Sequence, residues 1–146
     1  MATFSRNVTV NWEGSIMEGK GSAKAGSGAF TLPISFPRRI GDAEGVTSPE
    51  ELIAAAHASC YAMALNATVG RKGGSIAKTD VTATVSADKG DAGITITSSK
   101  LSVTAHGLTG IPKEQFAEVA REAEGKCPVS NALRGSLKID VDAKAV

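Results

Sequence analysis

The pattern of hydrophobic and polar positions predicts one long helix in the middle of the chain, over residues 49–69. Ser48 suits the N-cap position, and Pro49 is a residue type favoured at the first helical position. Glu51, three residues after Ser48, completes a capping box, and Gly70 is expected to end the helix in a left-handed conformation. Apolar and small residues occur on all sides of this segment, which indicates a buried helix.

Alternation of apolar and polar residues predicts strands on both sides of this helix. Residues 7–14 alternate and end at a glycine turn, which indicates the start of a meander of short strands. Residues 80–86 and 94–103 indicate a long antiparallel hairpin, with a turn at 89–93 between them. Residues 137–141 predict a final strand with one apolar face.

The remaining segments complete the expected architecture. Residues 112–124 carry apolar side chains at helical spacing and are followed by Gly125, which predicts an amphipathic helix. Residues 36–48 contain Pro37, Gly41 and Gly45 and predict an irregular loop. Because strands and helices occur in blocks, we expect an α+β fold, with antiparallel strands around a long buried central helix, in one domain over residues 1–146.

Composition excludes several classes of protein. The 146 residues are 42% hydrophobic, which is enough for a core, and the net charge is only +1. Aromatic residues make up 4%, so the basic face and stacking platform of a nucleic-acid binder are absent. The start of the chain has no signal-peptide pattern, and no apolar run approaches membrane-spanning length, so we expect a cytoplasmic protein without a membrane partner.

Two cysteines, Cys60 and Cys127, carry the candidate chemistry. In a reducing compartment they are better explained as free or transiently bonded thiols than as a permanent disulfide. Cys127 precedes Pro128, which can start another short helix, so its thiolate would face unpaired amides, with Lys126 as a neighbouring cation. This position favours a reactive thiol, whereas a cysteine buried in a helix, such as Cys60, is usually a small hydrophobe.

The run from Thr47 to Cys60, followed 67 residues later by Cys127-Pro128-Val129-Ser130, resembles the OsmC/Ohr family of organic hydroperoxide reductases. Trp12-Glu13-Gly14 and Gly19-Lys20-Gly21 fit the same family. The stretch Ala-Ala-His-Ala-Ser-Cys that ends at Cys60 is similar to the OsmC branch.

This resemblance implies an α+β fold in which two subunits intertwine as a homodimer. It also implies that Cys60 attacks an organic hydroperoxide, that Cys127 resolves the resulting sulfenic acid as a disulfide, and that Arg39 and Glu50 support Cys60. Arg39 is preferred over the adjacent Arg38. The implied reductant is a dithiol, for example of the lipoyl type, and no metal or organic cofactor is required.

The chemistry explains why these residue types belong together. The reactive form of cysteine is the thiolate, whereas a free thiol has a pKa of about 8.5 and burial raises it further. Cys60 therefore needs a cation, which Arg39 would supply, while Glu50 would offset the desolvation of the guanidinium. Glu50 and Cys60 are about 15 Å apart along a straight helix, so Glu50 of one chain would serve Cys60 of the other.

Several alternatives to this interpretation can be weighed on the residues themselves. The protein could bind a small apolar ligand under stress, with weak peroxidase activity, or it could exchange disulfides. His57, one helical turn before Cys60, could tune the thiol, although a core histidine with satisfied hydrogen bonds is the simpler interpretation. His57, His106 and the two cysteines could in number form a zinc site, but the paired close spacings of zinc modules are missing.

Overall fold

The computed structural model describes residues 3–146, and these form two compact units. The first unit runs to Pro49, and the second runs from Glu50 to Val146. Each unit is built around its own three-stranded sheet. The single domain over residues 1–146 remains a prediction.

The first unit is an antiparallel sheet in the order β1 (Val8–Glu13), β2 (Lys20–Ala25) and β3 (Thr31–Ile34). A short helix, α1 (Phe36–Ile40), follows the third strand. The sequence predicted a loop here, and this prediction is wrong for α1. Pro37 lies in the first turn of α1, where its fixed φ angle suits a helix and its missing N–H group costs no hydrogen bond.

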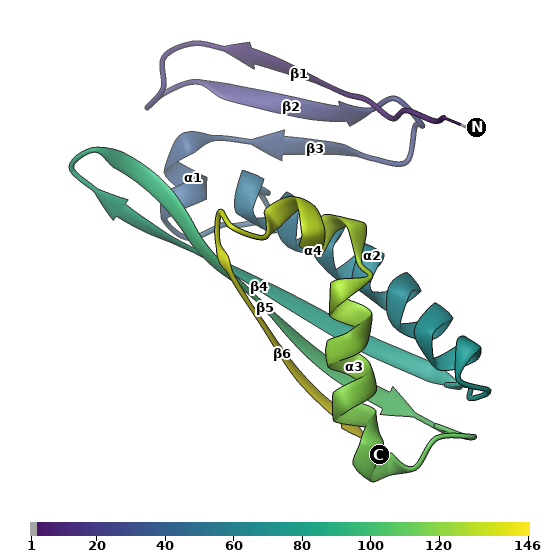
Figure 1. Ribbon diagram of the computed structural model, residues 1–146. Coiled ribbons are helices and arrows are strands. Elements are labelled where there is room, and N and C mark those ends of the chain that lie inside the picture. The colour runs from purple at the N-terminus through teal and green to yellow at the C-terminus, as the bar shows by residue number, and fades with distance from the viewer. Residues whose placement is uncertain (1–2) are drawn as a thin grey trace. The chain divides into compact units, whose positions relative to one another are not determined.

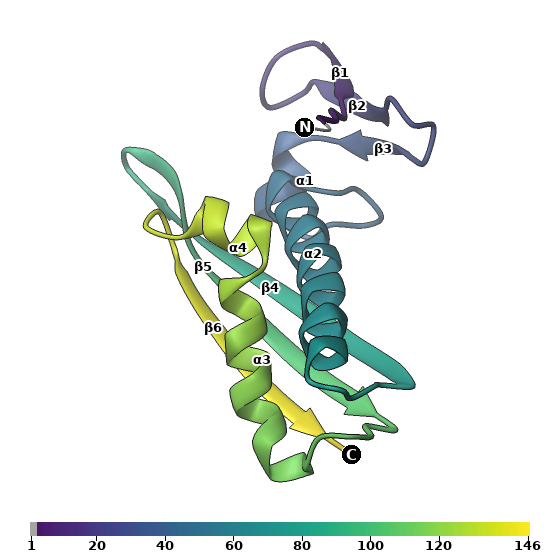
Figure 2. The ribbon, with the colours of Figure 1, turned by 45° about the vertical axis from the view of Figure 1, so that its right-hand side comes forward.

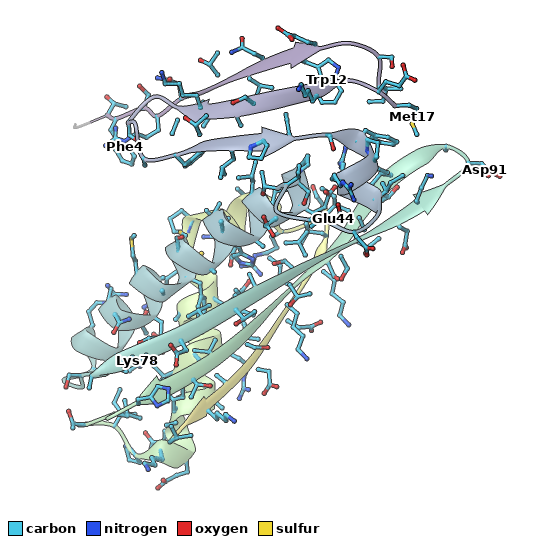
Figure 3. All side chains as sticks on the ribbon, turned by 180° about the vertical axis from the view of Figure 1, so that it is seen from behind. Phe4, Trp12, Met17, Glu44, Lys78 and Asp91 are labelled. Atoms are coloured by element: carbon cyan, nitrogen blue, oxygen red, sulfur yellow. The ribbon has the colours of Figure 1, made fainter. Side chains whose placement is uncertain are left out.

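Close packing between β1 and β2 explains why glycine stands at position 21, the last residue of the Gly19-Lys20-Gly21 motif. Trp12 on β1 lies opposite Gly21 on β2, and Figure 3 labels its ring on this sheet. A Cβ atom on Gly21 would lie 2.6 Å from the Asn11 carbonyl oxygen and 2.9 Å from the Trp12 ring, so a side chain at this position would collide with both. The indole N–H donates to the Gly14 carbonyl at 3.0 Å, which ties the ring to the turn after β1.

The second unit places helices on one face of a mixed sheet. Its elements are α2 (Pro49–Arg71, the first residue of which ends the other unit), β4 (Lys78–Gly90), β5 (Gly93–His106), η1 (Lys113–Gln115), α3 (Phe116–Gly125), α4 (Pro128–Leu133) and β6 (Lys138–Ala145). Figures 1 and 2 show α2 and α3 on the same face of the β4-β5-β6 sheet.

The sheet of the second unit departs in one respect from the predicted antiparallel arrangement. The hairpin of β4 and β5 is antiparallel, as predicted, and is longer than the sequence indicated; Figure 3 labels Asp91 at its turn. The last strand, β6, instead pairs with β5 in parallel. Parallel neighbours need a crossover connection, and the helices α3 and α4 supply it between β5 and β6.

The long helix begins at Pro49 as predicted, but it continues past Gly70 to Arg71. Gly70 is helical, and the left-handed conformation occurs at Gly73, which has a φ angle of 80°. The chain then closes the helix with a bond from the Gly74 N–H group to the Val69 carbonyl at 3.0 Å. Two glycines close together both satisfy the sequence signal for a helix end, and the hydrogen bond decides between them.

Only one stripe of α2 is buried within the chain, although its sequence is apolar on all sides. This stripe packs against β5 and α3 in the core of the second unit. Tyr61 and Leu65 on α2, Leu101 on β5 and Phe116 on α3 are core residues with no exposed surface. On another side of α2, Met63 is 73% exposed. The sequence predicted that α2 is buried on every face, but within its own chain only one face of α2 is buried.

By length and composition alone, α2 could also cross a membrane. This differs from the expectation that no segment reaches membrane-spanning length. Core helices of soluble proteins pass the same test, and the buried stripe of α2 packs into the core shared with β5 and α3. Its position in the second unit is therefore that of a core helix.

Candidate functional site

The two cysteines meet where α4 begins. Cys60 lies in the middle of α2, and Cys127 is the N-cap residue of α4. Cys60 packs against the core cluster that contains Cys127, and both Cys127 and the Val129 amide lie close enough to shift the pKa of the Cys60 thiol. Both cysteines are free thiols. The fold thus brings together two residues that are 67 positions apart in the sequence.

The surroundings of Cys60 favour its protonated form. Partial burial raises the pKa of the Cys60 thiol above its ordinary value, and the neighbouring Cys127 thiol raises the pKa further. The Val129 amide acts in the opposite direction, because it stabilises the thiolate, but it does not reverse the shift. The groups of the second unit that set this pKa include no cation. A reactive thiolate at Cys60 therefore requires a positive charge beyond these groups.

Cys127 occupies the predicted N-cap position, and it is completely buried. Its sulfur accepts a hydrogen bond from the Ser130 N–H group at 3.4 Å. The expected cation beside it serves another purpose, because the Lys126 ammonium group binds the Glu122 carboxylate at 3.1 Å. Backbone amides, more than Lys126, therefore define the polar surroundings of Cys127.

His57 has both ring nitrogens in hydrogen bonds and no exposed surface. Its Nδ1 atom lies 2.6 Å from Ser99 Oγ, and its Nε2 atom lies 2.7 Å from Ser130 Oγ. Burial lowers the pKa of His57 below its ordinary value, although the negative charge of Glu124 raises it in part. A neutral imidazole that donates to one serine and accepts from the other fits these contacts. His57 is thus a core histidine with satisfied hydrogen bonds.

The two adjacent arginines have different surroundings in the first unit. Arg38 forms an ion pair with Glu44 at 2.7 Å and donates to the Asp42 carbonyl at 3.3 Å, so it braces its own loop. Arg39 instead lines an open pocket of about 120 Å³. The pocket walls are otherwise mostly apolar and come from the same unit: Trp12, Ile16, Ile34, Ser35, Phe36, Thr47 and Pro49.

Glu50 lies in the first turn of α2, and the helix continues without interruption past Cys60. At 1.5 Å per residue, the two positions are about 15 Å apart along the axis. Within one chain, Glu50 and Cys60 therefore lie too far apart to serve one site, as the sequence predicted for an unbroken helix.

The histidines and cysteines do not gather into one cluster in the described part of the chain. His106 on β5 lies 2.8 Å from Asp80 on β4, and the carboxylate pKa of Asp80 is lowered chiefly by this hydrogen bond. Among residues 3–146, no group of three or more potential ligands from His, Cys, Asp and Glu is arranged to hold a metal ion.

Comparison with known proteins gives the family. The family model described as "OsmC-like protein" matches residues 41–142. The chain belongs to the OsmC family. It is 38% identical to Peroxiredoxin OsmC of Escherichia coli over 144 residues, which cover 98% of this chain and 99% of the relative.

An Ohr relative and a solved structure extend this comparison. The organic hydroperoxide resistance protein OhrA of Bacillus subtilis is 32% identical over 116 residues, covering 76% of this chain and 78% of the relative. The crystal structure of an organic hydroperoxide resistance protein from Elizabethkingia anophelis superimposes with a TM-score of 0.75 at 23% identity, covering 100% of both chains. These matches confirm the predicted family and its α+β fold.

The sequence did not single out Ser99 as part of the site. It is 42 positions from its partner His57, and no local motif marks it. Ser130 appeared only as the last residue of the second cysteine motif. Its link to His57, 73 positions away, follows from the fold alone.

Proposed function

We propose that this protein is a cysteine-based peroxidase that reduces organic hydroperoxides to alcohols in oxidative or osmotic stress defence. The observation that carries the proposal is the proximity of the free thiols of Cys60 and Cys127 within the second unit. Two free thiols in such contact can form a disulfide after one of them is oxidised. The names of the two relatives, a peroxiredoxin and an organic hydroperoxide resistance protein, support the same activity.

The proposed cycle begins when the Cys60 thiolate attacks the outer oxygen of ROOH. The O–O bond breaks, the alkoxide takes a proton and leaves as ROH, and Cys60 becomes a sulfenic acid. The Cys127 thiol then attacks the Cys60 sulfur, so that a disulfide forms and water leaves. A dithiol, for example of the lipoyl type, reduces the disulfide by exchange and becomes a disulfide itself, which returns both cysteines as thiols.

Arg39 and Glu50 are proposed to activate Cys60. Burial raises the pKa of this thiol, and a guanidinium group that never deprotonates would offset that shift. Arg39 is the better of the two candidates because it lines the mostly apolar pocket, whereas Arg38 braces its own loop through Glu44. Glu50 would form a bidentate pair with the guanidinium group and hold it in place.

The pocket at Arg39 supports an organic peroxide as the substrate. Its walls include Trp12, Ile16 and Phe36, which suit an alkyl group, and Arg39 supplies a charge for the peroxide oxygens. The same pocket of about 120 Å³ also suits another small apolar molecule, and affinity for such a molecule that survives Cys60→Ser would favour the alternative of a ligand-binding protein.

We further propose that the protein works as a homodimer in the cytoplasm. Met63 on α2 is 73% exposed, and Val8 and Val10 on β1 are 52% and 53% exposed, so each unit has apolar surface that a second copy could cover. The separation of Glu50 from Cys60 on one helix also requires a second chain if both residues serve one site. Free thiols at Cys60 and Cys127 suit a reducing compartment.

The first test is intact mass and peptide mapping of the reduced protein after one equivalent of cumene hydroperoxide. We expect loss of two hydrogens with a Cys60–Cys127 linkage, and a sulfenic acid at Cys60 in the Cys127→Ser variant. Arg39→Lys should slow oxidation of Cys60, whereas the matched Arg38→Lys change should not. If both thiols of the wild type stay reduced, the peroxidase proposal fails.

A further inference from the structure

The first turn of α4 divides its backbone amides between the two cysteines. Pro128 has no N–H group to give. The next amide, of Val129, lies near the Cys60 sulfur and favours its thiolate, and the amide after it, of Ser130, donates to the Cys127 sulfur at 3.4 Å. Neighbouring residues of one turn therefore hold both thiols, and any displacement of this turn would move the two sulfurs relative to each other.

A buried network fixes this turn to the rest of the second unit. The Ser130 hydroxyl group lies 2.7 Å from Nε2 of His57, and the other side of the His57 ring lies 2.6 Å from the Ser99 hydroxyl group. All three residues have no exposed surface. The chain of contacts thus runs from β5 through α2 to α4, and its last member is the residue whose amide holds Cys127.

The helix α2 binds this turn at two points, one helical turn apart. Cys60 contacts Cys127 and Val129, and His57, three residues earlier, contacts Ser130. One of these contacts changes during the proposed reaction, because Cys60 is oxidised, whereas the contact of His57 involves no reacting atom. His57 can therefore keep α4 in place while the chemistry at Cys60 proceeds.

We propose that His57, anchored by Ser99, positions Cys127 through Ser130, and that this network sets the rate at which Cys127 resolves the Cys60 sulfenic acid. His57, Ser99 and Ser130 are positioning residues in this scheme and do not touch the peroxide. The inference rests on the proposed two-cysteine peroxidase activity. It assigns a functional role to a histidine that would otherwise be only part of the core.

The physical basis is the effective concentration of one thiol at the other. Intramolecular attack depends on holding the reacting atoms at the correct distance and angle. The helix α4 has only six residues, so it has little stability of its own and depends on contacts with its neighbours. Without the Ser130 hydroxyl group, the turn would sample more positions, and Cys127 would spend less time beside Cys60.

The decisive variant is Ser130→Ala, which removes the hydroxyl group but keeps the backbone amide that holds Cys127. Ser130→Thr should restore the hydroxyl group. Ser102→Ala, on an exposed position of β5, is the matched control. Each full-length variant is first shown to be folded by its urea unfolding curve. Rapid mixing with one equivalent of cumene hydroperoxide and quenching with dimedone then measure the lifetime of the Cys60 sulfenic acid.

We expect Ser130→Ala to slow resolution about tenfold, the effect of one buried hydrogen bond. The second-order reaction of Cys60 with peroxide, measured in a Cys127→Ser background, should not change. The disulfide should also become about tenfold easier to reduce in a thiol redox buffer, a shift of about 30 mV toward less negative potential. Ser130→Thr should recover most of both losses, and Ser102→Ala should match the wild type.

The opposite results overturn the inference. Resolution at the wild-type rate in Ser130→Ala contradicts the positioning role, and equal slowing of both chemical steps indicates general damage and contradicts it too. If Ser130→Ala does not fold, Ser99→Ala is used instead, because it removes the hydrogen bond that holds His57 and leaves Ser130 intact. Slower resolution in Ser99→Ala supports the inference, and an unchanged rate refutes it. A wild type that never forms the disulfide with peroxide would instead refute the proposed function, and the redox-buffer equilibrium would still test the positioning role.

Discussion

Whether Glu50 serves the cysteine of its own chain or that of a partner can be decided with two inactive variants. One chain carries Glu50→Gln, and the other carries Cys60→Ser. The helix α2 runs unbroken from Pro49 to Arg71, so ten residues separate the two positions by about 15 Å along the axis and by about 80° around it. Even with the Arg39 guanidinium group between them, hydrogen bonds near 3 Å cannot span this distance.

The expected activity follows from counting sites in the mixed dimer. If sites are shared, one site combines the intact Cys60 of the first chain with the intact Glu50 of the second chain, and the other site lacks both residues. A purified mixed dimer should then have about half the activity of the wild type. Random mixing of equal amounts, in which half of the dimers are mixed, should give about a quarter.

The assay is consumption of cumene hydroperoxide with a dithiol reductant, using chains with two different affinity tags so that mixed dimers can be isolated. The matched control places both substitutions in one chain and pairs it with a wild-type chain. Shared sites predict almost no activity for this control, whereas sites within one chain predict about half. Activity in the control, and none in the first mixed dimer, would refute the argument from the helix spacing.

Two further predictions concern stability. The pKa of buried His57 is lowered in the folded protein, so below about pH 6.5 the unfolded chain binds a proton more readily than the folded chain does. The free energy of unfolding should therefore not depend on His57 above this pH. Below it, the free energy of unfolding should fall by up to about 1.4 kcal/mol per pH unit. Urea unfolding between pH 7.5 and 5 should show this loss in the wild type and in His106→Gln, and His57→Gln should flatten it; a slope that His57→Gln leaves unchanged would contradict the assignment. Phe116 has no exposed surface, and Phe116→Ala should lower the free energy of unfolding by about 3–5 kcal/mol. The control Glu114→Ala, at an exposed position, should lower it by less than about 0.5 kcal/mol. Equal urea midpoints for the two variants would show that Phe116 does not support the core.

Local sequence signals were sufficient to predict elements whose formation depends mainly on neighbouring residues. The start of α2 was predicted at Pro49 because the residue types that favour a helix start are contiguous there. The hairpin of β4 and β5 was predicted because it needs only alternation and a turn. The five-residue helix α1 was missed, because a segment with Pro37 and nearby glycines also satisfies the signals for a loop.

Long-range features could not be predicted from local patterns. Nothing in residues 137–141 indicates that β6 pairs with β5 in parallel, because strand alternation is the same for both directions. The exposure of Met63 was also not visible, since an apolar helix surface does not reveal whether its own chain or a second copy covers it.

The candidate site shows the same limit. The family resemblance named Cys60 and Cys127, and the structure brings these two together. It named Arg39 and Glu50 as well, and these remain predictions. The hydrogen bonds of His57 to Ser99 and Ser130 join segments that are far apart in the sequence, so only the fold could reveal them.

The surroundings of Cys60 argue that the two chemical steps depend on different parts of the protein. Residues of the second unit hold Cys60 and Cys127 in contact, which serves resolution, but they raise the pKa of Cys60, which opposes attack on peroxide. We therefore expect the activating charge to come from a residue that plays no part in holding the thiols, and Arg39 in the first unit is the proposed source. It follows that Arg39→Lys should slow oxidation and spare resolution, whereas Ser130→Ala should do the reverse. A variant of either kind that impaired both steps would show that activation and resolution are not separable in this fold.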